Sequence, residues 1–270
     1  MSSIGLIGAG NMGTALVRGL IASGQAAGEE LIVFDIDGEK TELLKEAFNV
    51  GIASSAADTV GAGTETLVLA VKPQIMGVVL DEISDRVGAQ PLVITIAAGV
   101  PCSFYLSRLH EGVRLIRAMP NAAAIVGQSA TALCKAGNAD EEDLRRATGI
   151  FTAFGTAVVV DEKMMNVVTA LSGSGPGYLF PILEGLTDGG VLMGLDRPTA
   201  RELAVQTMLG AATMAAQEDA SFSELKDRIT SPGGTTIAGL RVMERAGARG
   251  ILMDAIKAAT ERGDELQSEG

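Results

Sequence analysis

Six residues near the start of the chain constrain its fold more than any other segment. Gly8-Ala9-Gly10-Asn11-Met12-Gly13 is a GxGxxG sequence between an apolar run at 4–7 and a helical pattern at 13–22. In a strand–turn–helix unit the first glycine allows a tight turn, the second lets the backbone approach a pyrophosphate, and the third lets the helix pack on the strand. Free amides at the helix start can then bind phosphate. An ordinary strand-to-helix turn is the alternative. The segment predicts dinucleotide binding by Gly8, Gly10, Asn11, Met12 and Gly13.

Short apolar runs alternate with helical patterns over the first 161 residues. The runs do not alternate between polar and apolar residues, which is typical of parallel strands covered on both faces. We expect strands at 4–7, 31–34, 67–71, 92–97, 114–119 and 157–160, and helices at 13–22, 39–47 and 141–154. Repeated strand–helix units of this kind predict an α/β fold, a Rossmann doubly wound parallel sheet.

The β-branched runs stop after Asp161, and the remaining pattern is helical. Ser221-Phe222-Ser223-Glu224 is a capping box, and Pro198 lies where a first helical turn accepts proline. A last helix is expected over 248–267. The chain of 270 residues therefore divides into a Rossmann domain at 1–161 and an all-α domain at 162–270, in line with ordinary domain sizes.

Composition excludes several functions. The net charge of −12 argues against a nucleic-acid surface, which needs a basic patch. Two uncharged stretches, 87–107 and 164–183, contain proline and glycine breaks that would leave backbone groups unsatisfied in lipid. No signal peptide precedes the first strand, so we expect a cytoplasmic protein. Cys102 and Cys134 lack metal-site spacing and His110 lies in a charged stretch, so the chemistry should need neither metal nor histidine.

Asp35 ends the second expected strand, 35 − 13 = 22 residues after the last glycine of the motif. A carboxylate about 20 residues on can accept hydrogen bonds from the adenosine ribose and repel a 2′-phosphate. Asp37 adds charge, and no arginine adjoins it in the sequence. The cofactor is predicted to be NADH or NADPH, with NADH favoured.

Other strand ends should reach the same site, because ligands bind outside the carboxyl ends of parallel strands. The cofactor-binding residues predicted there are Ala70, Lys72, Pro73, Ala97, Gly99 and Asn121. A solvated loop lysine is an equal alternative for Lys72.

Two further segments are dense in small and hydroxyl residues: Thr169-Ala170-Leu171-Ser172-Gly173-Ser174-Gly175-Pro176 and Ser231-Pro232-Gly233-Gly234-Thr235-Thr236. The second reads as a turn before a helix start, where free amides and hydroxyls suit a carboxylate. In this order behind an N-terminal GxGxMG, the two segments resemble pyrroline-5-carboxylate reductases over essentially the whole chain.

That resemblance implies an NAD(P)H-dependent enzyme that reduces 1-pyrroline-5-carboxylate to L-proline, the final step of proline biosynthesis. It implies that the helical domain forms a homodimer, or a larger assembly of dimers, with a small-molecule substrate and no nucleic-acid or membrane partner. Thr169 matches a catalytic threonine whose hydroxyl lies near the ring nitrogen. Substrate binding is assigned in the same way to Ser231, Gly234, Thr235 and Thr236. Gly177 and Ala122-Ala123 depart from the usual family pattern.

Two alternatives have different functions. A β-hydroxyacid dehydrogenase would pair a lysine and an asparagine four residues apart, but Lys163 and Asn166 are three apart. A non-catalytic dinucleotide sensor would have no need of the hydroxyl groups at Thr169, Ser231 and Thr236.

Overall fold

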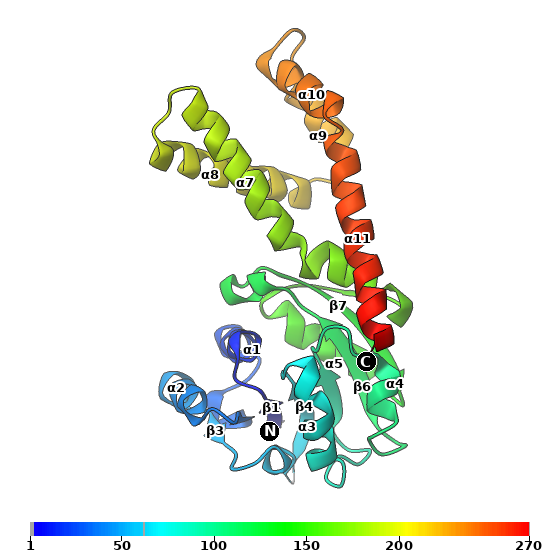
Figure 1. Ribbon diagram of the computed structural model, residues 1–270. Helices are drawn as coiled ribbons and strands as arrows, with labels where there is room; N and C mark the ends of the chain where they lie inside the picture. Colours follow the sequence, from blue (N-terminus) through cyan, green and yellow to red (C-terminus); the bar gives the residue numbers. More distant parts are fainter. Residues whose placement is uncertain (1–2, 62, 270) are drawn as a thin grey trace. The chain divides into compact units, whose positions relative to one another are not determined.

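The computed structural model describes residues 3–61 and 63–269, which form two compact units (Figure 1). The first contains the chain up to Ser174 together with the C-terminal segment from Ala259, and the second is Gly175–Ala258. The predicted boundary after Asp161 lies within the first unit. There, Met165 is buried in the apolar cluster that covers one face of the sheet.

The first unit is built on one sheet of eight strands in the order β3-β2-β1-β4-β5-β6-β7-β8. The strands are β1 Ser3–Ile7, β2 Leu31–Phe34, β3 Gly51–Ile52, β4 Thr64–Leu69, β5 Leu92–Thr95, β6 Arg114–Met119, β7 Ser129–Gly137 and β8 Gly155–Val159. Every neighbouring pair is parallel except β6 and β7. The predicted Rossmann-type sheet is confirmed, and its parallel strands β1, β4, β5 and β6 end at one edge.

The sequence prediction did not include the strand β7. It runs antiparallel to β6, with Ala132 beside Met119. Its sequence, SATALCKAG, is rich in alanine and glycine, which are depleted in strands, so no β-branched run marks it. The strand β3 was also missed, because it contains only two residues.

Helices cover both faces of the sheet. On one face, α1 (Asn11–Ala22), α2 (Gly38–Phe48) and α5 (Glu141–Thr152) contribute to a buried aliphatic cluster. On the other, α3 (Met76–Ile83) and α4 (Cys102–Leu106) pack in a second cluster. Cys102 and Cys134 are free and buried in the second cluster, as expected for small apolar side chains. These layers hold the strand ends in fixed positions.

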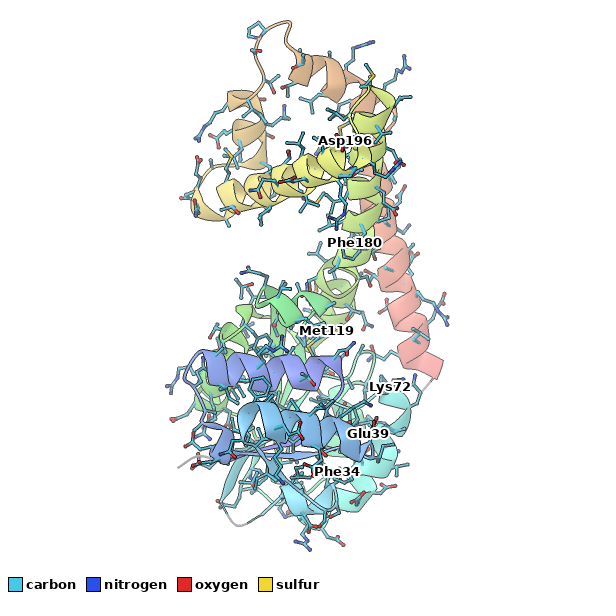
Figure 2. All side chains as sticks on the ribbon, turned by 90° about the vertical axis from the view of Figure 1, so that its left-hand side faces the viewer. Phe34, Glu39, Lys72, Met119, Phe180 and Asp196 are labelled. Atoms are coloured by element: carbon cyan, nitrogen blue, oxygen red, sulfur yellow. The ribbon has the colours of Figure 1, made fainter. Side chains whose placement is uncertain are left out.

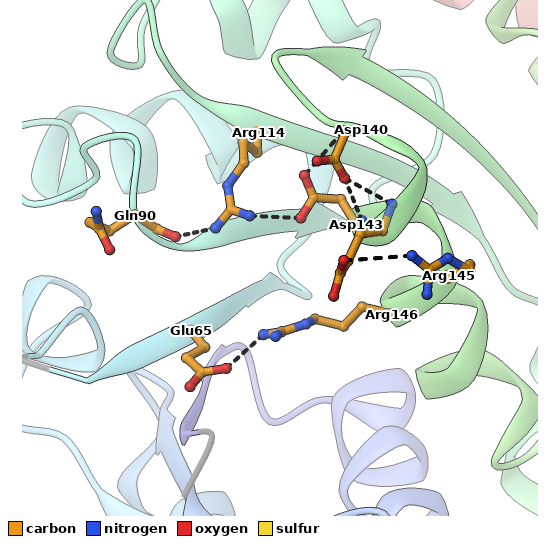
Figure 3. Close-up of polar contacts among 8 residues, drawn as sticks. Glu65, Gln90, Arg114, Asp140, Asp143, Arg145 and Arg146 are labelled. Atoms are coloured by element: carbon orange, nitrogen blue, oxygen red, sulfur yellow. Dashed lines mark hydrogen bonds and ion pairs between the residues drawn. The ribbon is translucent and has the colours of Figure 1, made fainter.

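An ion pair links β6 to α5 (Figure 3). Arg114 Nη1 lies 2.8 Å from Oδ1 of Asp143, whose side chain is buried. Asp143 also accepts the backbone amide of Asp140 in a capping box at the start of α5. Arg114 donates in addition to the carbonyl of Gln90. Because this charge pair is partly desolvated, breaking it should destabilise the sheet more than breaking an exposed pair.

The second unit is helical. Its helices are α7 Gly175–Leu192, α8 Arg197–Gln217, α9 Phe222–Arg228, α10 Thr235–Arg245 and the first part of α11 Ala248–Glu269. The capping box at Ser221 and the proline in the first turn of α8 are both confirmed. No helix among the described residues is long and apolar enough to cross a membrane.

The apolar side chains of this second unit are largely exposed in the single chain. Leu192 is 84% exposed and Phe222 80%, and many other leucine, valine and methionine side chains share this exposure. Its buried residues are Thr187, Ala200 and Ala204. Exposed apolar side chains in such number on one helical unit indicate an interaction surface.

Candidate functional site

The glycine turn after β1 has the geometry that its sequence predicts. Gly8 has a φ of +107°, and a Cβ atom on it would lie 2.5 Å from the Ala70 carbonyl oxygen. A Cβ atom on Gly13 would lie 2.0 Å from the Gly8 oxygen. At Gly10 an added Cβ would meet no described protein atom within 4 Å. Protein packing therefore requires glycine at two positions, while the third leaves room for a ligand to approach the backbone.

The N-terminus of α1 lies directly beside this turn. Gly10 is its N-cap and supplies no side-chain acceptor. The amides of Asn11, Met12 and Gly13 belong to the first turn, which lacks intrahelical partners. Free amides at the positive end of a helix dipole bind phosphate, so these residues fit the pyrophosphate of a dinucleotide.

Asp35 follows β2, which ends at Phe34 (Figure 2), and its carboxylate is held by backbone amides. Its Oδ2 accepts the Ala9 amide at 2.7 Å and its Oδ1 accepts the Asp37 amide at 2.9 Å. The carboxylate is thus fixed against the glycine turn, and each oxygen keeps a second lone pair for a ribose hydroxyl.

Two cationic side chains also lie near this turn, and the sequence prediction did not include them. A groove of about 480 Å³ is lined by Gly10 and Asn11 together with Arg18 of α1 and Lys40 of α2. Lys40 Nζ lies 3.1 Å from Asp37 Oδ2, and this contact lowers the pKa of Asp37 below its ordinary value. Lys40 is therefore already partly neutralised. Arg18 and Lys40 are 22 residues apart in the sequence, so only the packing of α1 beside α2 brings them together (40 − 18 = 22).

The loops after β4 and β5 contribute the other predicted cofactor residues. Ala70 adjoins Gly8, and Lys72 is exposed just before the short helix η3, Pro73–Ile75 (Figure 2). The Ala97 amide donates to the Thr95 hydroxyl at 3.4 Å, and Gly99 has a φ of +75°.

Asn121 links the end of β6 to the segment that contains Thr169. Its Nδ2 donates to the Ser172 carbonyl at 3.0 Å, and its Oδ1 accepts the Ala123 amide at 3.2 Å. Both side-chain functions are thus used within the protein. Asn121 holds the Ser172 turn in place, and its predicted contact with cofactor stays a prediction.

Thr169 lies where the helix α6 (Met165–Val168) widens into a π-helical turn, Thr169–Gly173. Its Oγ1 donates to the Met165 carbonyl at 2.8 Å. Such π turns occur frequently at functional sites. Thr169 also lines a pocket of about 440 Å³, together with Pro73, Ala98 and Gly99. The structure therefore brings the predicted catalytic threonine and predicted cofactor residues into one pocket.

A half-exposed glutamate, Glu162, fixes the start of α4 just after the Ala97–Pro101 segment, and the sequence prediction did not include it. Glu162 Oε1 accepts the Cys102 amide at 2.6 Å and lies 3.4 Å from Nη1 of the buried Arg117. Nearby, the Thr95 and Tyr105 hydroxyls are 2.6 Å apart, and burial raises the pKa of Tyr105 to about 12. Tyr105 is therefore neutral at physiological pH and acts as a hydrogen-bonding group rather than a proton source.

The second predicted segment lies in the helical unit. Gly233 has a φ of +67°, Gly234 is the N-cap of α10, and its amide donates to the Ser231 carbonyl at 3.1 Å. Within the described part of the chain, the hydroxyls of Ser231, Thr235 and Thr236 have no hydrogen-bond partner, and no side chain caps α10. The predicted turn and helix start are confirmed, and their donors are available to a ligand.

Comparison with known proteins identifies the family. Residues 162–266 match the model for pyrroline-5-carboxylate reductase dimerisation, and residues 3–99 match the model NADP oxidoreductase coenzyme F420-dependent. The chain is 45% identical over 263 residues to a pyrroline-5-carboxylate reductase of Methanosarcina acetivorans, covering 97% of each protein. The chain belongs to the pyrroline-5-carboxylate reductase family.

Solved structures of this family have the same architecture. A pyrroline-5-carboxylate reductase from Coxiella burnetii superimposes with a TM-score of 0.93 at 35% identity, over 98% of both chains. A pyrroline carboxylate reductase from Plasmodium falciparum, solved with NADP bound, has a TM-score of 0.86 at 30% identity, over 98% of both chains. The family resemblance inferred from the sequence is confirmed. The dimerisation model also accounts for the exposed apolar side chains of the helical unit, which supports homo-oligomerisation.

Proposed function

We propose that the protein reduces 1-pyrroline-5-carboxylate to L-proline with a hydride from a nicotinamide dinucleotide, the last step of proline biosynthesis. The observation that carries this proposal is the pocket that joins Ala98 and Gly99 to Thr169. The open backbone at Gly10 and the uncapped start of α1 fit the cofactor's pyrophosphate. We further propose that the helical unit forms a homodimer or a larger assembly of dimers.

The reaction requires the protein mainly to bind the two reactants and to orient them. When bound, the reduced nicotinamide supplies a hydride to the imine carbon, and a proton on the nitrogen completes the amine. A protonated or hydrogen-bonded imine accepts hydride readily, so the described residues need supply no strong base. The protein's contribution is to align the two reactants, and alignment of this kind can supply about 7–11 kcal/mol.

The substrate carboxylate is assigned to the start of α10. Ser231, Thr235 and Thr236 carry free hydroxyls, and no arginine lies between Ser231 and Thr236. Each charge-assisted hydrogen bond to a carboxylate contributes about 1.5–3 kcal/mol. Several such bonds would select a carboxylated imine over one that lacks the group.

This function predicts that the purified protein oxidises NADH or NADPH only when pyrroline-5-carboxylate is present. 1-Pyrroline, which lacks the carboxylate, should be reduced far less efficiently. Thr236→Val should lower kcat/KM for the carboxylated substrate by about tenfold or more and leave 1-pyrroline almost unaffected, because the lost contact never existed there.

Absorbance at the reduced-cofactor band measures all four combinations of enzyme and substrate. The proposed function is wrong if the folded protein shows no imine-dependent oxidation of NADH or NADPH. Equal losses on both substrates would mean that Thr236 supports the helix and not the ligand.

The cofactor preference is assigned to Asp35. Its fixed carboxylate repels a 2′-phosphate, and Lys40, which lines the adjoining groove, is already paired with Asp37. Asp35→Ser should therefore raise the efficiency with NADPH relative to NADH by about one to a few kcal/mol. Asp35→Asn should act in the same direction while keeping an acceptor for the Ala9 amide.

Glu39→Gln is the matched control, because it removes one charge from the first turn of α2, does not line the groove, and leaves the Asp37–Lys40 pair in place. It should shift the NADPH/NADH ratio of kcat/KM less than either Asp35 variant. A wild-type preference for NADPH, or an unchanged ratio in both Asp35 variants, contradicts this role.

A further inference from the structure

Asn166 lies in the pocket beside Thr169 and has a fixed orientation. It is nine-tenths buried, and its Nδ2 donates to Asp264 Oδ1 at 2.7 Å and to Gln267 Oε1 at 2.8 Å. Asp264 and Gln267 belong to the end of α11, which returns to the first unit. Because a carboxylate only accepts hydrogen bonds, the amide nitrogen must face Asp264.

The other end of the Asn166 amide has no partner within the described part of the chain. With both N–H donors used, Oδ1 is left as an acceptor, and neither a backbone amide nor a side chain donates to it. Asn166 lies one helical turn before Thr169 and lines the same pocket, to which Ala98 and Gly99 also contribute. Among the described residues the fully buried side-chain atom without a partner is Arg114 Nε, so Asn166 Oδ1 keeps access to solvent. A ligand that enters the pocket can therefore replace water at this oxygen with an N–H donor.

We propose that Asn166 is a further ligand-binding residue of this pocket, with its Oδ1 accepting an N–H from a reactant. This inference rests on the proposed function. Two reactant groups have the required chemistry: the carboxamide of the nicotinamide ring and the protonated imine nitrogen. Asp264 and Gln267 are positioning residues, because they aim the Asn166 oxygen by holding its nitrogen.

Asn166→Leu is the principal test, since it keeps the approximate volume and removes the acceptor. If the carboxamide is the donor, the Kd for NADH, measured by fluorescence without substrate, should rise about tenfold or more. The Kd for reduced 3-acetylpyridine adenine dinucleotide, which has no carboxamide N–H, should stay unchanged. If the imine is the donor, the Kd for NADH should not move, while kcat/KM for pyrroline-5-carboxylate falls about tenfold or more.

The paired variant Asn166→Asp with Asp264→Asn separates ligand binding from mere support. It exchanges donor and acceptor across the contact and again leaves a carboxyl oxygen toward the pocket, so it should recover most of what Asn166→Leu loses. Asp264→Ala should give an intermediate loss. Melting temperatures of the free proteins report folding independently.

The inference would be overturned if Asn166→Leu kept both the Kd for NADH and the kcat/KM for the imine within twofold of wild type. It would also be overturned by a paired variant that recovers the melting temperature but neither ligand parameter. Failure of the proposed function looks different, because wild-type protein would then bind NADH yet show no imine-dependent oxidation.

Discussion

Gly10→Ala should leave the free protein as stable as wild type and lower its affinity for NADH by about tenfold or more. The added Cβ meets no described protein atom within 4 Å, so the fold has no reason to resist it. The same methyl group would stand where the second glycine of the motif lets a pyrophosphate approach the backbone. Stability and cofactor binding should therefore separate at this position.

Gly13→Ala provides the contrast. Its Cβ would lie 2.0 Å from the Gly8 carbonyl oxygen, a backbone atom that the rest of the turn holds in place. Overpacking of this kind costs about 1–3 kcal/mol or more and should lower the Tm by several degrees. Cofactor binding should fall as well, because relief of the clash requires the helix start to move.

Thermal unfolding without cofactor and fluorescence titration with NADH measure the two effects separately. The role assigned to Gly10 is wrong if Gly10→Ala binds NADH as tightly as wild type. The role assigned to Gly13 is wrong if Gly13→Ala keeps the wild-type Tm.

The glycine turn shows which parts of the site the sequence can predict. Gly8, Gly10 and Gly13 are fixed by local backbone geometry, and the helix start that they open follows within the same few residues. The start of α10 was predicted for the same reason, since the Pro-Gly-Gly turn and the helix that follows it are adjacent in the chain. In both cases the interactions are local, so spacing alone identifies them.

Contacts between distant segments were not predictable in this way. The sequence around Asn166 offers only its spacing from Lys163, because no neighbouring residue indicates a contact with Asp264, which is 98 residues away. Glu162 meets the Cys102 amide only because η5 (Glu162–Met164) packs beside the start of α4. Such pairs depend on tertiary packing, which local sequence patterns do not reveal.

The fold prediction has the same limit. The apolar runs that form the parallel strands were recognised, because strands buried on both faces need continuous apolar side chains. The strand β7 is built largely from Ala130, Ala132, Ala136 and similar small residues, and it pairs with β6 over residues 132–137 and with β8 over residues 129–133. Its strand conformation comes from that pairing rather than from its own propensity.

Thr169→Val should lower kcat by roughly ten- to a thousandfold and leave NADH affinity almost unchanged. In the free protein the Thr169 hydroxyl donates to the Met165 carbonyl, so its oxygen lone pairs remain to accept a hydrogen bond in the pocket. A protonated imine nitrogen is such a donor. The contact would be made with a charged group near the reacting carbon, and valine keeps the shape without it.

Thr148→Val is the matched control for this substitution. Thr148 Oγ1 donates to the Leu144 carbonyl at 2.8 Å, the same distance as Thr169 Oγ1 to Met165, but it lies on α5 and does not line the pocket. Loss of a hydroxyl that only bonds its own helix should change stability slightly and kcat not at all, because such bonds compete with rather than reinforce the helix. A Thr169→Val enzyme with wild-type kcat would place Thr169 in the same class as Thr148. A large loss in kcat for Thr169→Val alone, with equal melting temperatures for the two variants, would assign the effect to the hydroxyl in the pocket.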